Sequence, residues 1–186
     1  MTQQIADSVT YNGETYYTYS NPFHQYRFTF KPKERPRFYG AHSANWNGYE
    51  SDYAIKDNKL LLIKFEGNLS NPIDNTYRVV GLDHFFPGKK EVFASWFTGS
   101  LILYTENQLN ENDRGNKSDS TDELYLEFKK GQLIASGMVN SKLVSIINSR
   151  EWELWDIKHR KKRTFWWYLG RKFFQRWIFF DDEINA

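Results

Sequence analysis

Asp83 and His84 are the adjacent residues best suited to acid–base chemistry, because a carboxylate and an imidazole can pass a proton near neutral pH. Neighbours in an extended segment point to opposite faces, so each would need a further partner. The sequence has no glycine-flanked serine elbow and no second histidine nearby. We therefore expect no enzyme, with a hydrolase around this pair as an alternative. The favoured role of His84 is to order the turn at Pro87-Gly88.

Metal and cofactor chemistry has little support in the sequence. Cysteine is absent, which excludes disulfides, thiolate catalysis and cysteine-ligated metals. A metal site would need His24, His42, Asp52 or Asp74 to converge, and their spacing makes no such convergence local. Glycines that could cradle a phosphate stand isolated. We expect neither a metal nor a cofactor.

Residues 152–180 form the densest basic and aromatic segment of the chain. They hold five of the seven tryptophans, and residues 158–176 contain eight Lys or Arg and no acid. Tryptophan and arginine are the residues most enriched at binding hot spots. The segment therefore predicts a partner-binding surface made by the following residues: Arg163, Trp166, Trp167, Arg171, Lys172 and Arg176.

Three other interpretations of that segment stay open. Lysine and arginine on an edge strand can simply discourage sheet-to-sheet aggregation. Lys and Arg with exposed aromatic rings also suit nucleic acid, and Trp with basic residues suits an anionic membrane surface. The net charge of +2 conceals a mildly acidic body, residues 1–157, whose field opposes a polyanion. A protein partner is therefore favoured over nucleic acid or membrane.

Composition predicts a mainly β fold to position these residues. The 186 residues suffice for a single domain, 1–186, and 18% of them are aromatic. Large, stiff side chains favour strands over helices. We expect an antiparallel sheet, a small sandwich or a barrel built from hairpins, with at most one or two short helices and α+β as the alternative. Trp46 and Trp96 are expected in the core.

Turn residues between β-prone runs predict four antiparallel hairpins. Asn12-Gly13 is the clearest, because both positions of a type I′ turn require positive φ. The hairpins are expected at 9–19, at 53–65, at 91–104 through Thr98-Gly99, and at 123–139.

Four further segments carry separate expectations. Residues 24–31 alternate polar and aromatic side chains, as a half-buried strand would. The polar stretch 107–122 predicts a mobile loop. Residues 141–148 predict a short helix capped by Asn140 or Ser141. The segment 152–180 fits either a helix or strands, and a β-meander is favoured because its residues are poor helix formers.

Five short motifs lie between residues 41 and 134: 45–49 (NWNGY), 53–62 (YAIKDNKLLL), 82–88 (LDHFFPG), 92–99 (VFASWFTG) and 123–128 (ELYLEF). In order and spacing they resemble a family of small uncharacterised cytoplasmic bacterial proteins, and the likeness covers half of the chain. The resemblance implies an immunity protein or another partner-binding protein. It names no catalytic residue.

The start of the chain lacks the basic residues and apolar run of a signal peptide, and no window reaches the ~18 apolar residues of a spanning helix. We therefore expect a cytoplasmic protein. Taken together, the sequence predicts a non-catalytic, protein-binding domain, in its most specific form an immunity protein that covers the active site of a cognate toxin.

Overall fold

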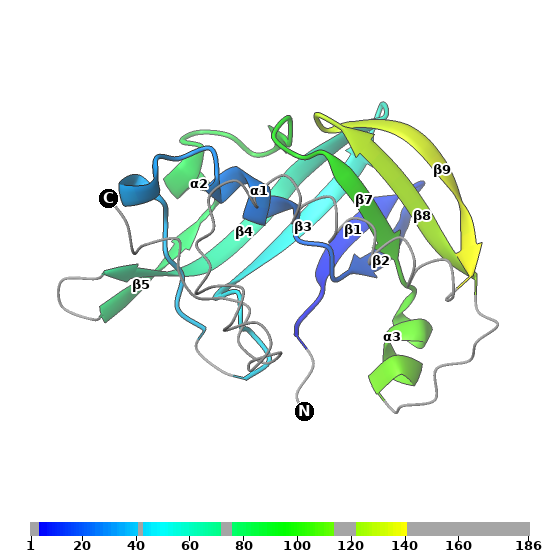
Figure 1. The fold of residues 1–186 in the computed structure, drawn as a ribbon, viewed down its shortest axis with the longest axis horizontal. Helices are drawn as coiled ribbons and strands as arrows, with labels where there is room; N and C mark the ends of the chain where they lie inside the picture. Colours follow the sequence, from blue (N-terminus) through cyan, green and yellow to red (C-terminus); the bar gives the residue numbers. More distant parts are fainter. Residues whose placement is uncertain (1–3, 41–42, 72–75, 114–121, 141–186) are drawn as a thin grey trace, which may run out of the picture. The chain divides into compact units, whose positions relative to one another are not determined.

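The computed structural model describes residues 4–40, 43–71, 76–113 and 122–140, in which nine strands form one mixed sheet (Figure 1). The mainly β prediction is confirmed. The strands are β1 (Asp7–Tyr11), β2 (Glu14–Thr18), β3 (Tyr49–Lys56), β4 (Lys59–Asn71), β5 (Thr76–Gly81), β6 (Val92–Phe93), β7 (Gly99–Leu103), β8 (Asp122–Lys129) and β9 (Gln132–Asn140). The described residues form three short α-helices, whereas at most two were predicted. They are α1 (Pro22–Arg27), α2 (Leu82–Phe85) and α3 (Glu106–Asp113).

Three of the four predicted hairpins are confirmed: β1–β2, β3–β4 and β8–β9. Each turns through residues with positive φ. Asn12 and Gly13 have φ of 53° and 83°. The turn after β3 has Asp57 and Asn58 in the same region, and the turn after β8 has Lys130 and Gly131. Short loops of this hand match the twist of the flanking strands.

The hairpin predicted at 91–104 is wrong. β6 pairs with β4, and β7 pairs with β8. The chain bends directly after β6, where Phe97 N donates to Ala94 O at 2.9 Å, and does not form a hairpin turn between β6 and β7. Gly131 N then donates to Phe97 O at 2.7 Å, which fixes this bend against the β8–β9 turn.

The strand predicted at 24–31 is also wrong, since its first part belongs to α1. Asn21 caps the helix, its Oδ1 accepting from His24 N at 3.2 Å, and Pro22 occupies the first turn. Phe23 and Tyr26 lie three residues apart and pack their rings 5.1 Å apart on one side of the helix. Alternation over a short apolar run did not distinguish this turn of helix from a strand.

The sheet is closed by two tyrosines. Its strand order is β2-β1-β3-β4-β9-β8-β7, and Tyr17 of β2 exchanges two 2.8 Å backbone hydrogen bonds with Tyr104, directly after β7. Of the predicted architectures, the barrel is the one this closure supports. The pairing of β1 with β3 is parallel, so the sheet is mixed rather than purely antiparallel.

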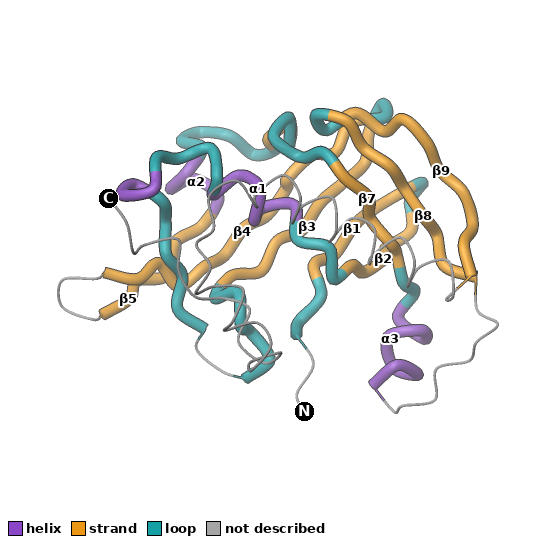
Figure 2. Tube along the Cα trace, viewed as in Figure 1, coloured by secondary structure: helices purple, strands orange, loops and turns teal. Residues whose placement is uncertain are grey.

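The core lies inside the closed part and beneath α1 and α2. Phe23, Tyr53, Leu60, Leu62 and Leu126 are among its fully buried side chains. Figure 2 shows α1 and α2 close together beside β4, and the rings of Phe23 and Phe85 lie 5.5 Å apart. These two helices therefore close the core where the sheet itself does not.

The two tryptophans expected in the core differ. The side chain of Trp46 is 58% exposed, so the core prediction is wrong for it. Trp96 is half-buried against the core. Its ring stacks on Phe86 at 5.7 Å, and its Nε1 donates to Pro22 O at 3.1 Å.

The mobile loop predicted at 107–122 is wrong for its first part, which forms α3. Thr105 and Gln108 build a capping box: Gln108 N donates to Thr105 Oγ1 at 3.4 Å, and Thr105 N donates to Gln108 Oε1 at 2.7 Å. Residues 114–121 lie outside the described residues. So do the helix predicted at 141–148 and the meander predicted at 152–180. Among the described helices, none has the length and apolar character needed to cross a membrane.

Candidate interaction surface

Asp83 and His84 are not arranged as an acid–base pair. Both lie in α2, and Asp83 Oδ1 accepts a 2.7 Å hydrogen bond from Gly88 N. The ring of His84 packs edge-on against Phe85 at 4.7 Å. The turn at Pro87-Gly88 is thus ordered by Asp83 rather than by His84, which corrects the prediction.

Of the histidine and carboxylate positions considered for a metal, His24 and Asp52 are described, and neither belongs to a ligand cluster. In the part of the chain that the structure describes, no three His, Cys, Asp or Glu side chains come together. Burial lowers the pKa of His24 to about 4, with Arg27 and Arg35 adding to the effect. Asp52 accepts from Ser8 Oγ at 2.7 Å. His42 and Asp74 lie outside the described residues.

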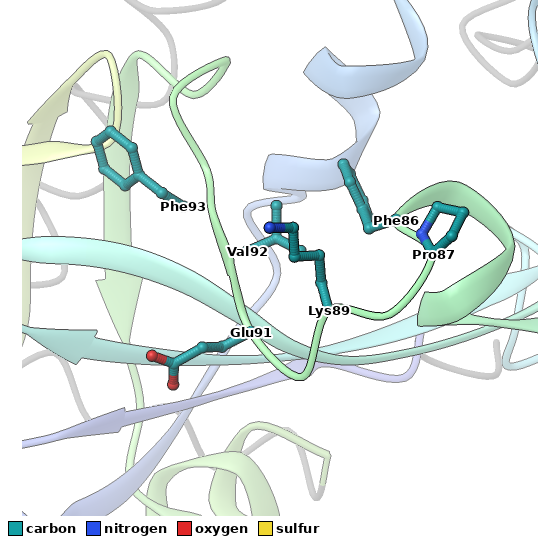
Figure 3. A pocket seen from close by; sticks show the side chains of 6 residues that line it. All are labelled: Phe86, Pro87, Lys89, Glu91, Val92 and Phe93. Carbon is teal, nitrogen blue, oxygen red and sulfur yellow. The ribbon is translucent and has the colours of Figure 1, made fainter.

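A depression of about 290 Å³ lies between the loop after α2 and β6 (Figure 3). Its lining is Phe86, Pro87, Lys89, Glu91, Val92 and Phe93. Glu91 and Phe93 extend to one side in Figure 3, while Phe86 and Pro87 lie on the other. Glu91 already pairs with Lys56 at 2.6 Å. The polar groups do not converge as a ligand site requires.

A group of three polar side chains, Asp7, Ser51 and Tyr53, lies in the interior of the closed sheet. Asp7 Oδ1 accepts from Ser51 N at 3.1 Å, and burial raises the pKa of Asp7 well above its usual range, with Asp52 and Glu50 adding to the rise. The Ser51 and Tyr53 hydroxyls are buried in the same interior. Because all three side chains are inaccessible, this group affects stability rather than the binding of an outside ligand.

A ribbon at the far end of β4 offers a different kind of surface. There β5 lies on one side of β4 and residues 37–39 lie on the other, and Figure 1 shows β5 extending past the end of β3. Phe38 and Leu69 oppose each other and both pack against the core. Side chains alternate along a strand, so the flanking residues of all three segments point away from the core.

We call these outward side chains the outer ribbon face: Arg37, Tyr39, Asn68, Ser70, Tyr77 and Val79. Tyr39 and Tyr77 stack with their centroids 5.2 Å apart and their planes at 15°. Tyr39 is 53% exposed, Tyr77 50% and Val79 63%. Three large side chains, two from β5 and one from residues 37–39, therefore form one exposed surface across β4.

Gly48, in the NWNGY motif, allows this surface to form. It has φ of 71°, and its O accepts from Asn68 N at 2.8 Å. A Cβ at this position would lie 2.7 Å from the carbonyl carbon and oxygen of Tyr39. Only glycine lets residues 38–39 lie this close to the start of β3.

The site residues predicted from the sequence and those of the outer ribbon face do not overlap. Arg163, Trp166, Trp167, Arg171, Lys172 and Arg176 all lie outside the described residues. The run of residues 76–80, TYRVV, is β-prone and alternates around Arg78, a signal that could have predicted an edge strand with exposed side chains. The chain matches no family model, no curated protein and no solved structure.

Proposed function

We propose that the protein is a non-catalytic protein-binding module and that the outer ribbon face is its contact surface. The stack of Tyr39 on Tyr77 beside Val79 carries the proposal. Tyrosine supplies a large contact area with few rotatable bonds and a polar tip, which is why it is enriched at protein interfaces. Asn68 and Ser70, on β4 between the two segments that carry the rings, add hydrogen-bonding groups of the kind found in such surfaces.

The charges near this surface favour a protein over nucleic acid. Glu50 and Glu66 oppose each other across β3 and β4, and Glu66 is two residues from Asn68 and shares its face. Together with Arg37, the cation of the outer ribbon face, these two carboxylates leave no excess of positive charge there to bind a phosphate backbone. The alternatives, nucleic acid or an anionic membrane surface, rest on residues 152–180 and gain no support from the described residues.

The more specific proposal is an immunity protein that neutralises a cognate toxin. Its support is the resemblance to small bacterial proteins, one motif of which includes Gly48, the residue that brings Tyr39 into the outer ribbon face. The motif thus supplies the glycine on which the position of Tyr39 depends, while Tyr39, Tyr77 and Val79 themselves lie outside the motifs.

Photo-crosslinking tests the proposal. A photoreactive amino acid replaces Tyr77 in the full chain, expressed in its own host, and Met138, 62% exposed on β9, serves as the control position. We expect a defined crosslinked protein from position 77 and none from position 138. Tyr39→Ser with Val79→Ser should abolish the crosslink, while Ile134→Ser with Met138→Ser should leave it. Equal crosslinking from both positions would contradict the proposal.

The immunity proposal needs a further result. The crosslinked protein, expressed alone, should arrest growth, and co-expression of the intact chain should restore it. Tyr39→Ser with Val79→Ser should fail to restore it. A crosslinked protein that is harmless on its own would remove the immunity role and leave the binding role standing.

A further inference from the structure

We propose that the partner binds as an extended strand added to the open edge of β5, and that this strand alternates apolar and acidic residues. The inference rests on the proposed function and names the chemistry of its partner. It follows from the direction of the backbone groups of β5 and from Arg78, which lies between Tyr77 and Val79.

Hydrogen bonds on the far side of β4 fix which groups of β5 are unused. Tyr39 N donates to Asn68 O, and Ser70 N donates to Arg37 O, both at 2.8 Å. Asn68 and Ser70 thus direct their backbone groups toward residues 37–39, and the alternation of an antiparallel ladder directs those of Leu69 toward β5.

The register carries that alternation across to β5. Leu69 opposes Arg78, so the N–H and C=O of Arg78 point toward β4. Those of Tyr77 and Val79 point the other way, to an edge with which no described residue pairs. The two residues with exposed apolar side chains are therefore also the two with outward-pointing backbone groups. Outward-pointing backbone N–H and C=O groups at the edge of a sheet are what an added strand pairs with.

Arg78 defines the charge of the added strand. Its exposed side chain lies on the opposite face from Tyr77 and Val79, in the row that Phe38 and Leu69 continue. The guanidinium of Arg27 lies 5.7 Å from the Phe38 ring, so this face carries a second cation. Opposite charges in cross-strand positions stabilise pairing. The partner residue opposite Arg78 is thus Asp or Glu, and its neighbours opposite Tyr77 and Val79 are apolar.

Arg78 also disfavours one register in which a second copy of this chain could add as the strand. The antiparallel register that pairs Tyr77 of one copy with Val79 of the other sets the two Arg78 side chains directly opposite each other. Like charges in that position destabilise a strand pair. Self-association is therefore an outcome of the test rather than the proposal.

A synthetic heptapeptide of alternating Val and Glu is the probe, and a peptide with Lys in place of Glu is its control. Both are titrated against the full chain while the backbone amides of residues 76–81 are followed by NMR. We expect the Glu peptide to shift these amides and the Lys peptide to leave them. Arg78→Glu should reverse the preference, so that the Lys peptide binds and the Glu peptide does not.

Val79→Pro separates strand addition from a contact of side chains alone. Proline removes an outward N–H and no ladder bond to β4, so the fold should survive it, as circular dichroism would verify. Val79→Ala removes the side chain and keeps the donor. We expect affinity for the Glu peptide to fall about threefold in Val79→Ala and at least tenfold in Val79→Pro, from loss of one hydrogen bond and of strand continuity.

Equal loss of affinity in the two variants, or no shift with the Glu peptide, would overturn strand addition. Crosslinking from position 77 that depends on Tyr39 and Val79 would still stand in that case, so the proposed function survives or fails separately. Concentration-dependent dimerisation through residues 76–81, measured by sedimentation, would overturn the acidic partner in favour of a second copy.

Discussion

In both the closed part of the sheet and the ribbon beyond it, side chains alternate between the two faces of each strand. The two regions differ in how much of each face is buried. In the closed part, one side of each strand is buried and even polar groups such as Asp7 and Tyr53 are enclosed. In the ribbon, the core-facing side holds Phe38 and Leu69, whereas the outward side leaves Tyr77 and Val79 uncovered. Burial thus accounts for stability in one region, and uncovered side chains are available for binding in the other.

The largest effect is expected from Phe23→Ala in the buried core that α1 covers. Phe23 is fully buried, and its ring lies 4.2 Å from that of Phe65, centroid to centroid. Removing it should lower the free energy of unfolding by about 3–5 kcal/mol. Urea denaturation measures this, with Tyr77→Ser as the ribbon counterpart, expected within ~0.5 kcal/mol of the intact protein. Similar losses of unfolding free energy in Phe23→Ala and Tyr77→Ser would contradict the contrast between the buried core and the ribbon.

The next largest effect on the free energy of unfolding is expected when the pH falls and His24 becomes protonated. The pKa of His24 is lowered to about 4 in the folded protein, whereas the unfolded value is ~6.5. Its contribution to stability is fully present above pH ~6.5 and is lost as the pH falls toward 4, by at most about 3 kcal/mol. His24→Leu should flatten this part of the stability profile.

Asp7 has the opposite pH dependence, because its pKa is raised and the folded state favours the protonated carboxyl. Its contribution is present below the unfolded pKa of ~3.9 and is lost as the pH rises through the folded pKa. Asp7→Asn should remove this loss and stabilise the protein at neutral pH. Thermal melts from pH 3 to 8 of the intact protein and of both variants separate the two effects, and an unchanged profile in either variant would contradict its assignment.

A smaller effect on stability, with a large one on binding, is expected from Gly48→Ala. Alanine at φ of 71° and a Cβ 2.7 Å from the Tyr39 carbonyl should together cost about 1–3 kcal/mol. Because the strain falls on residues 38–39, it should displace Tyr39 from Tyr77. Gly137→Ala in β9, where an added Cβ meets nothing within 4 Å, is the matched control. Intact binding in Gly48→Ala would show that the stack does not depend on this approach.

Local turn chemistry made part of the fold predictable. Asn12-Gly13 and the turns at Asp57 and Lys130 fix the register of three hairpins within a few residues. The helix at Phe23 was missed because residues 24–31 alternate polar and aromatic side chains, a pattern that a single turn of helix shares with a strand. The pairing of β6 with β4 and the closure by Tyr17 and Tyr104 join residues far apart in sequence, so no local pattern contains them.

The candidate surface was less predictable than the fold. Tyr77 and Val79 follow the alternation of an ordinary half-buried strand, and only the pairing partners of β4 reveal which face stays uncovered. Tyr39 reaches Tyr77 because the neighbouring Phe38 pairs with Leu69, a residue far away in the sequence. The basic aromatic segment 152–180 stays a prediction.

Amide hydrogen exchange of β5 tests the open edge most directly. In the free full-length protein, the amides of Tyr77 and Val79 should exchange rapidly, while those of Arg78 and Val80, directed toward β4, should be protected. Adding the alternating Val-Glu peptide should protect Tyr77 and Val79 and leave Arg78 and Val80 unchanged. Protection of Tyr77 and Val79 already in the free protein would contradict the account, because the edge would then be occupied by the chain itself.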